Sequence, residues 1–154
     1  MVDSRPTLRL RSSAFRSGGR IPVRFTCDGA GDSPPLAWGD VPDGTGQLAI
    51  VMRDLDAPPF ARVHWALAEL PPTPRRVAAG GAPARATPLP NHFGTRGYRG
   101  PCPRKRSAPH RYLFTLYALS SRPQLSPDSP PAEAEDAIRE AAQASATLLG
   151  RYSR

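Results

Sequence analysis

The sequence predicts a mainly β fold, an antiparallel β-sandwich of two sheets with an α-helix near the C-terminus. Short apolar segments with the alternation of β-strands recur along the 154 residues, and proline and glycine separate them. Only one segment has the apolar spacing of a helix. The sequence lacks the alternation of strands and helices typical of dinucleotide-binding folds, and it also lacks phosphate-binding glycine loops and zinc or hydrolase motifs. We therefore expect one domain over residues 1–154, and we expect no cofactor.

Five segments have strand character, namely residues 8–11, 21–25, 47–53, 63–67 and 112–119. Leu8 and Leu10 alternate with arginines, so both are expected on the face that packs against the core. Val23 and Phe25 are expected to point inward in the same way. The last segment is the longest and most aromatic, and it has no polar face. It therefore predicts a strand that is covered on both sides.

Residues 131–149 have the pattern of one long helix. Ser129 is placed to cap its N-terminus, and Glu133 lies where a carboxylate suits the helix dipole. Gly150 is placed to end it. A stripe of small and apolar residues recurs at helical spacing and consists of Ala137, Ala141, Ala144 and Leu148. This stripe predicts that the helix packs against a sheet.

A stretch rich in proline, glycine and arginine covers residues 71–109 and has little periodicity. A loop of this length inside one domain is either disordered or functional. We interpret its C-terminal end, residues 91–101, as a functional loop and residues 72–88 as surface linker.

The chain is basic, with 21 Lys and Arg against 13 Asp and Glu and a net charge of +8. The arginines are scattered, which favours a general composition bias over a nucleic-acid surface. The longest strongly apolar run, residues 48–52, is too short to cross a membrane, and the charged N-terminus does not resemble a signal peptide. Cys27 and Cys102 are too few for a disulfide scaffold. We expect a protein of the reducing cytoplasm, with no nucleic-acid partner and no transmembrane segment. Simple packing would explain both cysteines, and the sequence leaves their oxidation state open.

Polar clusters follow or interrupt the predicted strands at three places. Asp54 and Asp56 lie two apart on an extended chain and would point the same way, as an acid–base pair, a metal site or an ordinary turn. His64 lies within an apolar strand, either as a core residue or as a base in a pocket. His110 and Tyr112 share one strand face, where they could donate two hydrogen bonds to one anion or simply form a polar strand end.

Nine short motifs, taken together and in order, resemble the phosphatidylethanolamine-binding protein family and its bacterial, Raf-kinase-inhibitor-like branch. They occupy residues 14–22, 26–29, 33–38, 54–58, 64–65, 91–94, 97–103, 110–112 and 149–152. Among them, the DLDAP, HW, GYRGPCP and HRY elements contain the pocket residues that the resemblance implies. Each motif is weak alone, but their shared order along the whole chain identifies the family.

The resemblance implies two antiparallel sheets, a C-terminal helix and a small pocket for phosphate-like anions that works without a metal. The pocket residues it implies are Asp54, Asp56, His64, Gly100, His110 and Tyr112. Imidazole and phenol groups would donate to the anion, and Gly100 would let backbone N–H groups approach it. Asp54 would orient or charge a histidine. The resemblance also implies a protein partner and a homodimer.

Two functions fit these residues. The first is binding of a small anionic, phosphorylated or carboxylated ligand. The alternative is an enzyme, an isomerase, cyclase or hydrolase, that uses Asp54, His64 and His110 for acid–base chemistry. The chain departs from the family pattern at residues 104–106, where an Arg-Lys-Arg run places three cations near the expected pocket mouth. These cations strengthen anion capture, suit a larger anionic ligand, or belong to a solvated loop.

Overall fold

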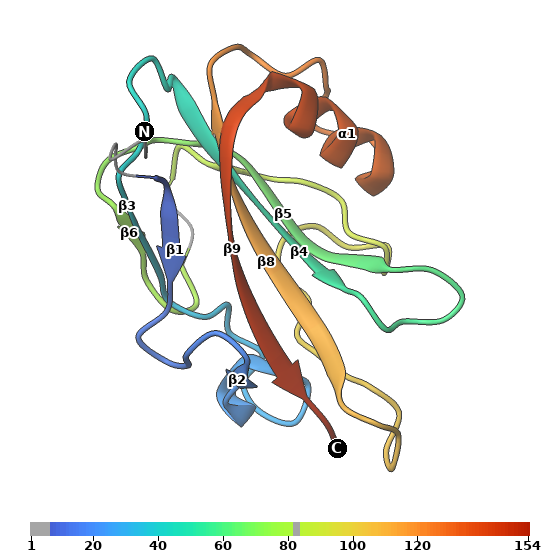
Figure 1. The fold of residues 1–154 in the computed structure, drawn as a ribbon. Coiled ribbons are helices and arrows are strands. Elements are labelled where there is room, and N and C mark those ends of the chain that lie inside the picture. The colour runs from blue at the N-terminus through green and yellow to red at the C-terminus, as the bar shows by residue number, and fades with distance from the viewer. Residues whose placement is uncertain (1–6, 82–83) are drawn as a thin grey trace, which may run out of the picture.

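Two β-sheets form the molecule in the computed structural model, which describes residues 7–81 and 84–154 (Figure 1). The larger sheet contains, in spatial order, β2 (Gly19–Arg20), β9 (Ala142–Tyr152), β8 (His110–Leu119), β4 (Gln47–Asp54), β5 (Arg62–Leu70) and β7 (Thr87–Pro88). The smaller sheet contains β1 (Arg9–Arg11), β3 (Leu36–Gly39) and β6 (Arg76–Val77). A 3-10 helix η1 (Val23–Phe25) and the helix α1 (Pro131–Ala141) complete the fold. The predicted mainly β class with two sheets and one helix is confirmed.

The central strands are covered on both faces because alternate residues enter two separate apolar clusters. In β4, Ile50 and Met52 belong to the core between the two sheets, whereas Ala49 and Val51 belong to the cluster under α1. In β8, Phe114 joins the first cluster in the same way. The expectation that residues 112–119 are covered on both sides is therefore correct, and these strands form a rigid platform.

The predicted helix over residues 131–149 is wrong in its second half. The helix ends at Ala141, and β9 follows directly and pairs with β8 along its whole length. Ala144 and Leu148 therefore lie on a strand, while the buried apolar residues of the helix are Ala134, Ile138 and Ala141. Tertiary pairing outweighs the helix preference of alanine here, because a long ladder and a shared core stabilise the strand.

The two residues expected at the ends of this helix, Ser129 and Gly150, have other roles. Gly150 lies within β9 opposite Tyr112, and a Cβ on Gly150 would lie 2.5 Å from Cγ1 of Ile21. The glycine is therefore required by close packing. Ser129 does not cap the helix, whose N-cap is Pro130; its Oγ instead accepts a hydrogen bond from the backbone N–H of Ser126 at 2.9 Å.

The segment 21–25 is not a strand, because β2 ends just before it at Arg20. The backbone N–H of Ile21 donates to the carbonyl of Arg151, but Pro22 has no N–H and cannot continue the ladder. The chain turns into η1 instead. Phe25 is buried as expected, whereas Val23 is 45% exposed, contrary to the expectation that it faces the core.

Cys27 and Cys102 form a disulfide, an oxidation state that the sequence left open. The bond joins the segment after η1 to the loop before β8, across a sequence separation of 75 residues. No helix in the described residues has the length and hydropathy needed to cross a membrane. Residues 1–6 of the N-terminal stretch and residues 82–83 of the expected linker lie outside the described residues.

Candidate functional site

A cavity of about 820 Å³ lies where β4 ends and where β5 and β8 begin. These ends meet because β4 pairs antiparallel with both neighbours. Five of the six expected site residues line the cavity, namely Asp54, Asp56, His64, Gly100 and His110. The sixth, Tyr112, is fully buried and does not line it.

His110 is fixed by the last residue of β4. Its Nδ1 lies 2.7 Å from Oδ2 of Asp54, and the Oδ1 atom of that buried carboxylate accepts the backbone N–H of Asp56 at 2.9 Å. A carboxylate accepts, so Nδ1 of His110 donates. This bond sets the orientation of the ring and leaves Nε2 as the nitrogen available to a ligand in the cavity. Asp54 thus acts on a histidine, in line with the family-based expectation.

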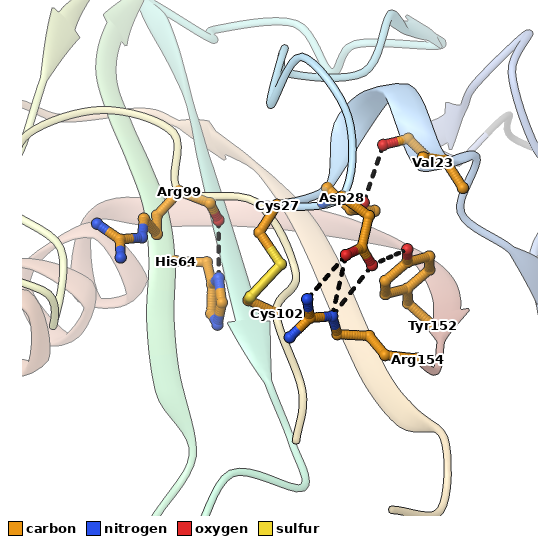
Figure 2. Close-up of a disulfide and its surroundings, with 9 residues drawn as sticks. Val23, Cys27, Asp28, His64, Arg99, Cys102, Tyr152 and Arg154 are labelled. Carbon is orange, nitrogen blue, oxygen red and sulfur yellow. Dashed lines mark hydrogen bonds and ion pairs between the residues drawn. A yellow bond between two sulfur atoms is a disulfide. The ribbon is translucent and has the colours of Figure 1, made fainter. Parts of the chain in front are cut away.

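His64 is held by the loop that precedes β8 (Figure 2). Its Nδ1 lies 2.7 Å from the carbonyl oxygen of Arg99, and the ring is 3% exposed. Because a carbonyl only accepts, Nδ1 carries the proton. Burial lowers the pKa of His64 below its ordinary value, so the ring is favoured in its neutral form. In that form Nε2 accepts a hydrogen bond, which differs from the expectation that both imidazoles donate.

Asp56 is separated from Asp54 by a turn and has a different partner. Its Oδ2 accepts the backbone N–H of Arg111 at 2.7 Å and Nε at 3.0 Å, and its Oδ1 accepts Nη2 at 2.9 Å. The Arg111 guanidinium holds the pKa of Asp56 below its usual range. The two aspartates therefore do not form an acid–base pair. Asp56 fixes the start of β8 beside the cavity.

Tyr112 lies next to the two imidazoles, away from the cavity. Its ring meets that of His64 edge-on at 5.5 Å between centroids and stacks on that of His110 at 6.3 Å. Among the described residues its hydroxyl has no hydrogen-bond partner. Burial, followed by the nearby charge of Asp54, raises the pKa of the phenol. The expected donation from Tyr112 to an anion is not supported by this position.

Gly100 lines the cavity, and the need for glycine at this position has a packing reason that the sequence did not indicate. A Cβ at this position would lie 2.7 Å from the carbonyl oxygen of Phe25 and 2.9 Å from Cα of Thr26. The backbone N–H of Cys27 donates to the carbonyl of Pro101 nearby, at 3.1 Å. The loop therefore lies directly against η1, and only glycine fits between them.

The motif at residues 91–94 contributes two rings that the sequence analysis left without a role. Nδ1 of His92 accepts the backbone N–H of Val63 at 2.7 Å, which fixes the strand beside His64. Burial lowers the pKa of His92, in keeping with this acceptor role. Phe93 meets the ring of His64 edge-on at 4.7 Å. The available sequence signal for these contacts is the match of residues 91–94 to the family motif.

Three arginines also line the cavity: Arg62, Arg99 and Arg104. Of the basic run at residues 104–106, only Arg104 does so. Within the described ranges, no group of three His, Cys, Asp or Glu side chains is placed to hold a metal ion. The site is therefore a cationic cavity with two oriented imidazoles.

The fold and this cavity define a class of small β proteins with a histidine-lined pocket at the end of the larger sheet. The family model described as Phosphatidylethanolamine-binding protein matches residues 11–153. The chain belongs to this family, as its motifs predicted.

Relatives of known sequence span almost the whole chain. It is 39% identical over 152 residues to a UPF0098 protein of Methanothermobacter thermautotrophicus, with coverage of 96% of this chain and 99% of that protein. It is 40% identical over 145 residues to the "Putative lipoprotein LppC" of Mycobacterium tuberculosis, with coverage of 94% and 72%.

Solved structures share the fold. The PEBP homologue CT736 of Chlamydia trachomatis superposes with a TM-score of 0.88 at 33% identity, covering 96% of this chain and 98% of that one. Escherichia coli YbcL, described as a member of the mammalian PEBP family, has a TM-score of 0.89 at 26% identity, covering 97% and 99%.

Proposed function

We propose that the protein binds a small phosphorylated or carboxylated ligand through Nε2 of His64 and Nε2 of His110. The supporting observation is that both rings have Nδ1 occupied by a protein acceptor, at 2.7 Å in each case. Each ring is therefore oriented before a ligand arrives, which reduces the entropy cost of binding. His64 accepts and His110 is paired with a carboxylate. A singly protonated phosphate ester complements this pair, because it offers one O–H donor and charged acceptor oxygens, whereas a carboxylate would interact through His110 alone.

The test is isothermal titration with inorganic phosphate and with acetate at pH 6. We expect His110→Asn to weaken phosphate binding at least tenfold, because the asparagine amide can still donate to Asp54 but lacks the Nε2 contact. The control is His92→Asn, which removes a histidine outside the cavity and retains an acceptor for Val63. Absence of phosphate and acetate binding by the wild type, or equal weakening by both variants, would refute the proposal.

The alternative is the acid–base enzyme with Asp54, His64 and His110 as its catalytic groups. One observation favours it, namely the hydrogen bond from His110 to Asp54, because a carboxylate in this position orients a general base. A bell-shaped pH profile of turnover on a small phosphorylated molecule, lost in Asp54→Asn, would support the enzyme.

The cytoplasmic location, the protein partner and the homodimer remain predictions. The disulfide favours an oxidising compartment, because such bonds are rare among cytosolic proteins. The relative LppC carries the word lipoprotein in its name, which agrees with a location outside the cytoplasm. Thiol alkylation in intact cells would decide between the two compartments. Labelling of Cys27 and Cys102 would show that they are reduced and would support the cytoplasm.

A further inference from the structure

The cavity wall contains positive charge that the protein does not neutralise. Asp54 and Asp56 are both engaged, with His110 and Arg111 respectively. The lining arginines are Arg62, Arg99 and Arg104, and none of them makes an ion pair within residues 7–81 and 84–154. We call these three arginines the arginine rim. Because the described residues place no free carboxylate beside the rim, an anionic group on a ligand is its natural counter-charge.

Two of these arginines are held in place by aromatic rings. The guanidinium carbon of Arg62 lies 5.2 Å from the ring centroid of Phe60, which is 54% exposed. That of Arg99 lies 5.2 Å from the centroid of Phe93. Such cation–π contacts restrict the side chains. Nη2 of Arg62 also donates to the carbonyl of Pro58 at 3.4 Å, and the remaining N–H groups of both guanidinium planes are left for a ligand.

Within the rim, Arg99 lies close to His64. Phe93 contacts both sites, since its centroid is 4.7 Å from that of His64 and 5.2 Å from the guanidinium carbon of Arg99. The distance from the ring centroid of His64 to the guanidinium carbon of Arg99 therefore cannot exceed the sum of those two distances. A small molecule with two charged groups can span it.

We propose that the arginine rim is a second anion site, so that the physiological ligand carries two anionic groups a few ångströms apart. This inference rests on the proposed function: one phosphate or carboxylate binds His64 and His110, and the second binds the rim. The family is named after an ethanolamine headgroup, which carries an ammonium group. At the rim this cation would face guanidinium groups of like charge, with no free carboxylate among the described residues to pair with it. The rim thus selects against a zwitterionic headgroup and for a dianionic small molecule.

Three phosphate esters of similar size test this selection by isothermal titration. Ethyl phosphate has a neutral tail, phosphoglycolate has a carboxylate, and phosphoethanolamine has an ammonium group. We expect phosphoglycolate to bind about tenfold more tightly than ethyl phosphate, and phosphoethanolamine no more tightly than ethyl phosphate. The advantage of phosphoglycolate should shrink as salt is added, because the rim is solvent-accessible.

Variants assign that advantage to the rim. In Arg104→Gln and in Arg99→Gln, the ratio of the two dissociation constants should fall towards one, while the thermal midpoint stays unchanged. Arg122→Gln is the matched control, because it removes an exposed arginine beyond the opposite end of β8. If no phosphate ester binds, the proposed function fails. If ethyl phosphate binds but phosphoglycolate has no advantage, if Arg122→Gln also removes it, or if phosphoethanolamine binds most tightly, the second site is refuted while the first stands.

Discussion

At the residue scale, the pKa of His64 connects stability to the site. Burial lowers this pKa below the ordinary 6.5. In the unfolded chain the imidazole takes up a proton near that ordinary value, whereas in the folded protein it stays neutral to lower pH. The free energy of unfolding therefore falls as the pH drops from about 6.5 towards the folded-state pKa, and this contribution is constant below it.

As the pH is lowered from 7 to 5, we expect the free energy of unfolding to fall less in His64→Asn than in the wild type. The asparagine amide still donates to the carbonyl of Arg99, so the variant removes the titration and keeps the hydrogen bond. Urea unfolding at both pH values measures the difference, and the carboxylates contribute equally to both proteins. His92 acts in the same direction and accounts for a remainder. Identical pH slopes in the two proteins would contradict this account.

Gly100 is the second residue whose role is steric. We expect Gly100→Ala to lower the free energy of unfolding by about 1–3 kcal/mol, because its methyl group would overlap the carbonyl of Phe25. Phosphate binding should weaken as the loop moves away from η1. Gly46→Ala is the control, since a Cβ there has no neighbour within 4 Å and the change should stay within about 0.5 kcal/mol. Equal stability of both variants in urea unfolding would show that the loop yields without cost.

At the element scale, the loop before β8 is held by contacts from three directions. Tyr98 donates its hydroxyl to the carbonyl of Phe25 at 2.7 Å, and the disulfide attaches Cys102 to Cys27. Asp28, next to the disulfide, accepts Tyr152 Oη at 2.5 Å and is chelated by Arg154 (Figure 2). The loop whose carbonyl orients His64 is thus held by η1 and the segment after it, and its Arg106 N–H donates to the carbonyl of Arg154, beyond β9, at 3.1 Å.

The elements differ in how far the sequence could predict them. The strands β4, β5 and β8 were predictable because their apolar runs reflect burial between two clusters. The strand β9 was not, since its alanines match a helix locally and only its pairing with β8 decides otherwise. Motifs located the cavity residues, but not their partners. The carbonyl of Arg99 that fixes His64 leaves no trace in residue identity, because every residue has a carbonyl.

At the scale of the whole molecule, the net charge of +8 has a local meaning. Many of the arginines are scattered and several are paired, for example Arg9 with Asp40 and Arg24 with Asp32. The composition bias expected from the sequence describes this surface well. The cavity differs, because its carboxylates are already engaged while its arginines have no ion-pair partner among the described residues. On the proposed function, the global excess would steer anions towards the protein, and the cavity would supply the oriented donors.

The disulfide covalently joins the segment after η1 to the loop that lines the cavity. Cys27 and Cys102 are separated by 75 residues, so the bond restricts a large part of the unfolded chain. We expect Cys27→Ser/Cys102→Ser to lower the free energy of unfolding by roughly 4 kcal/mol. Phosphate binding should weaken too, because the loop that carries Gly100 and the carbonyl partner of His64 loses its anchor. Urea unfolding and isothermal titration measure the two effects.

Reduction supplies the matched comparison for this last prediction. A reductant should bring the wild type to the stability and affinity of the double serine variant, and it should leave that variant unchanged. Both thiol positions are exposed, so reductant can reach the bond in the folded protein. If the reduced wild type keeps its full affinity, the contacts of Tyr98 and Gly100 with η1 suffice to hold the loop, and the disulfide then contributes to stability alone.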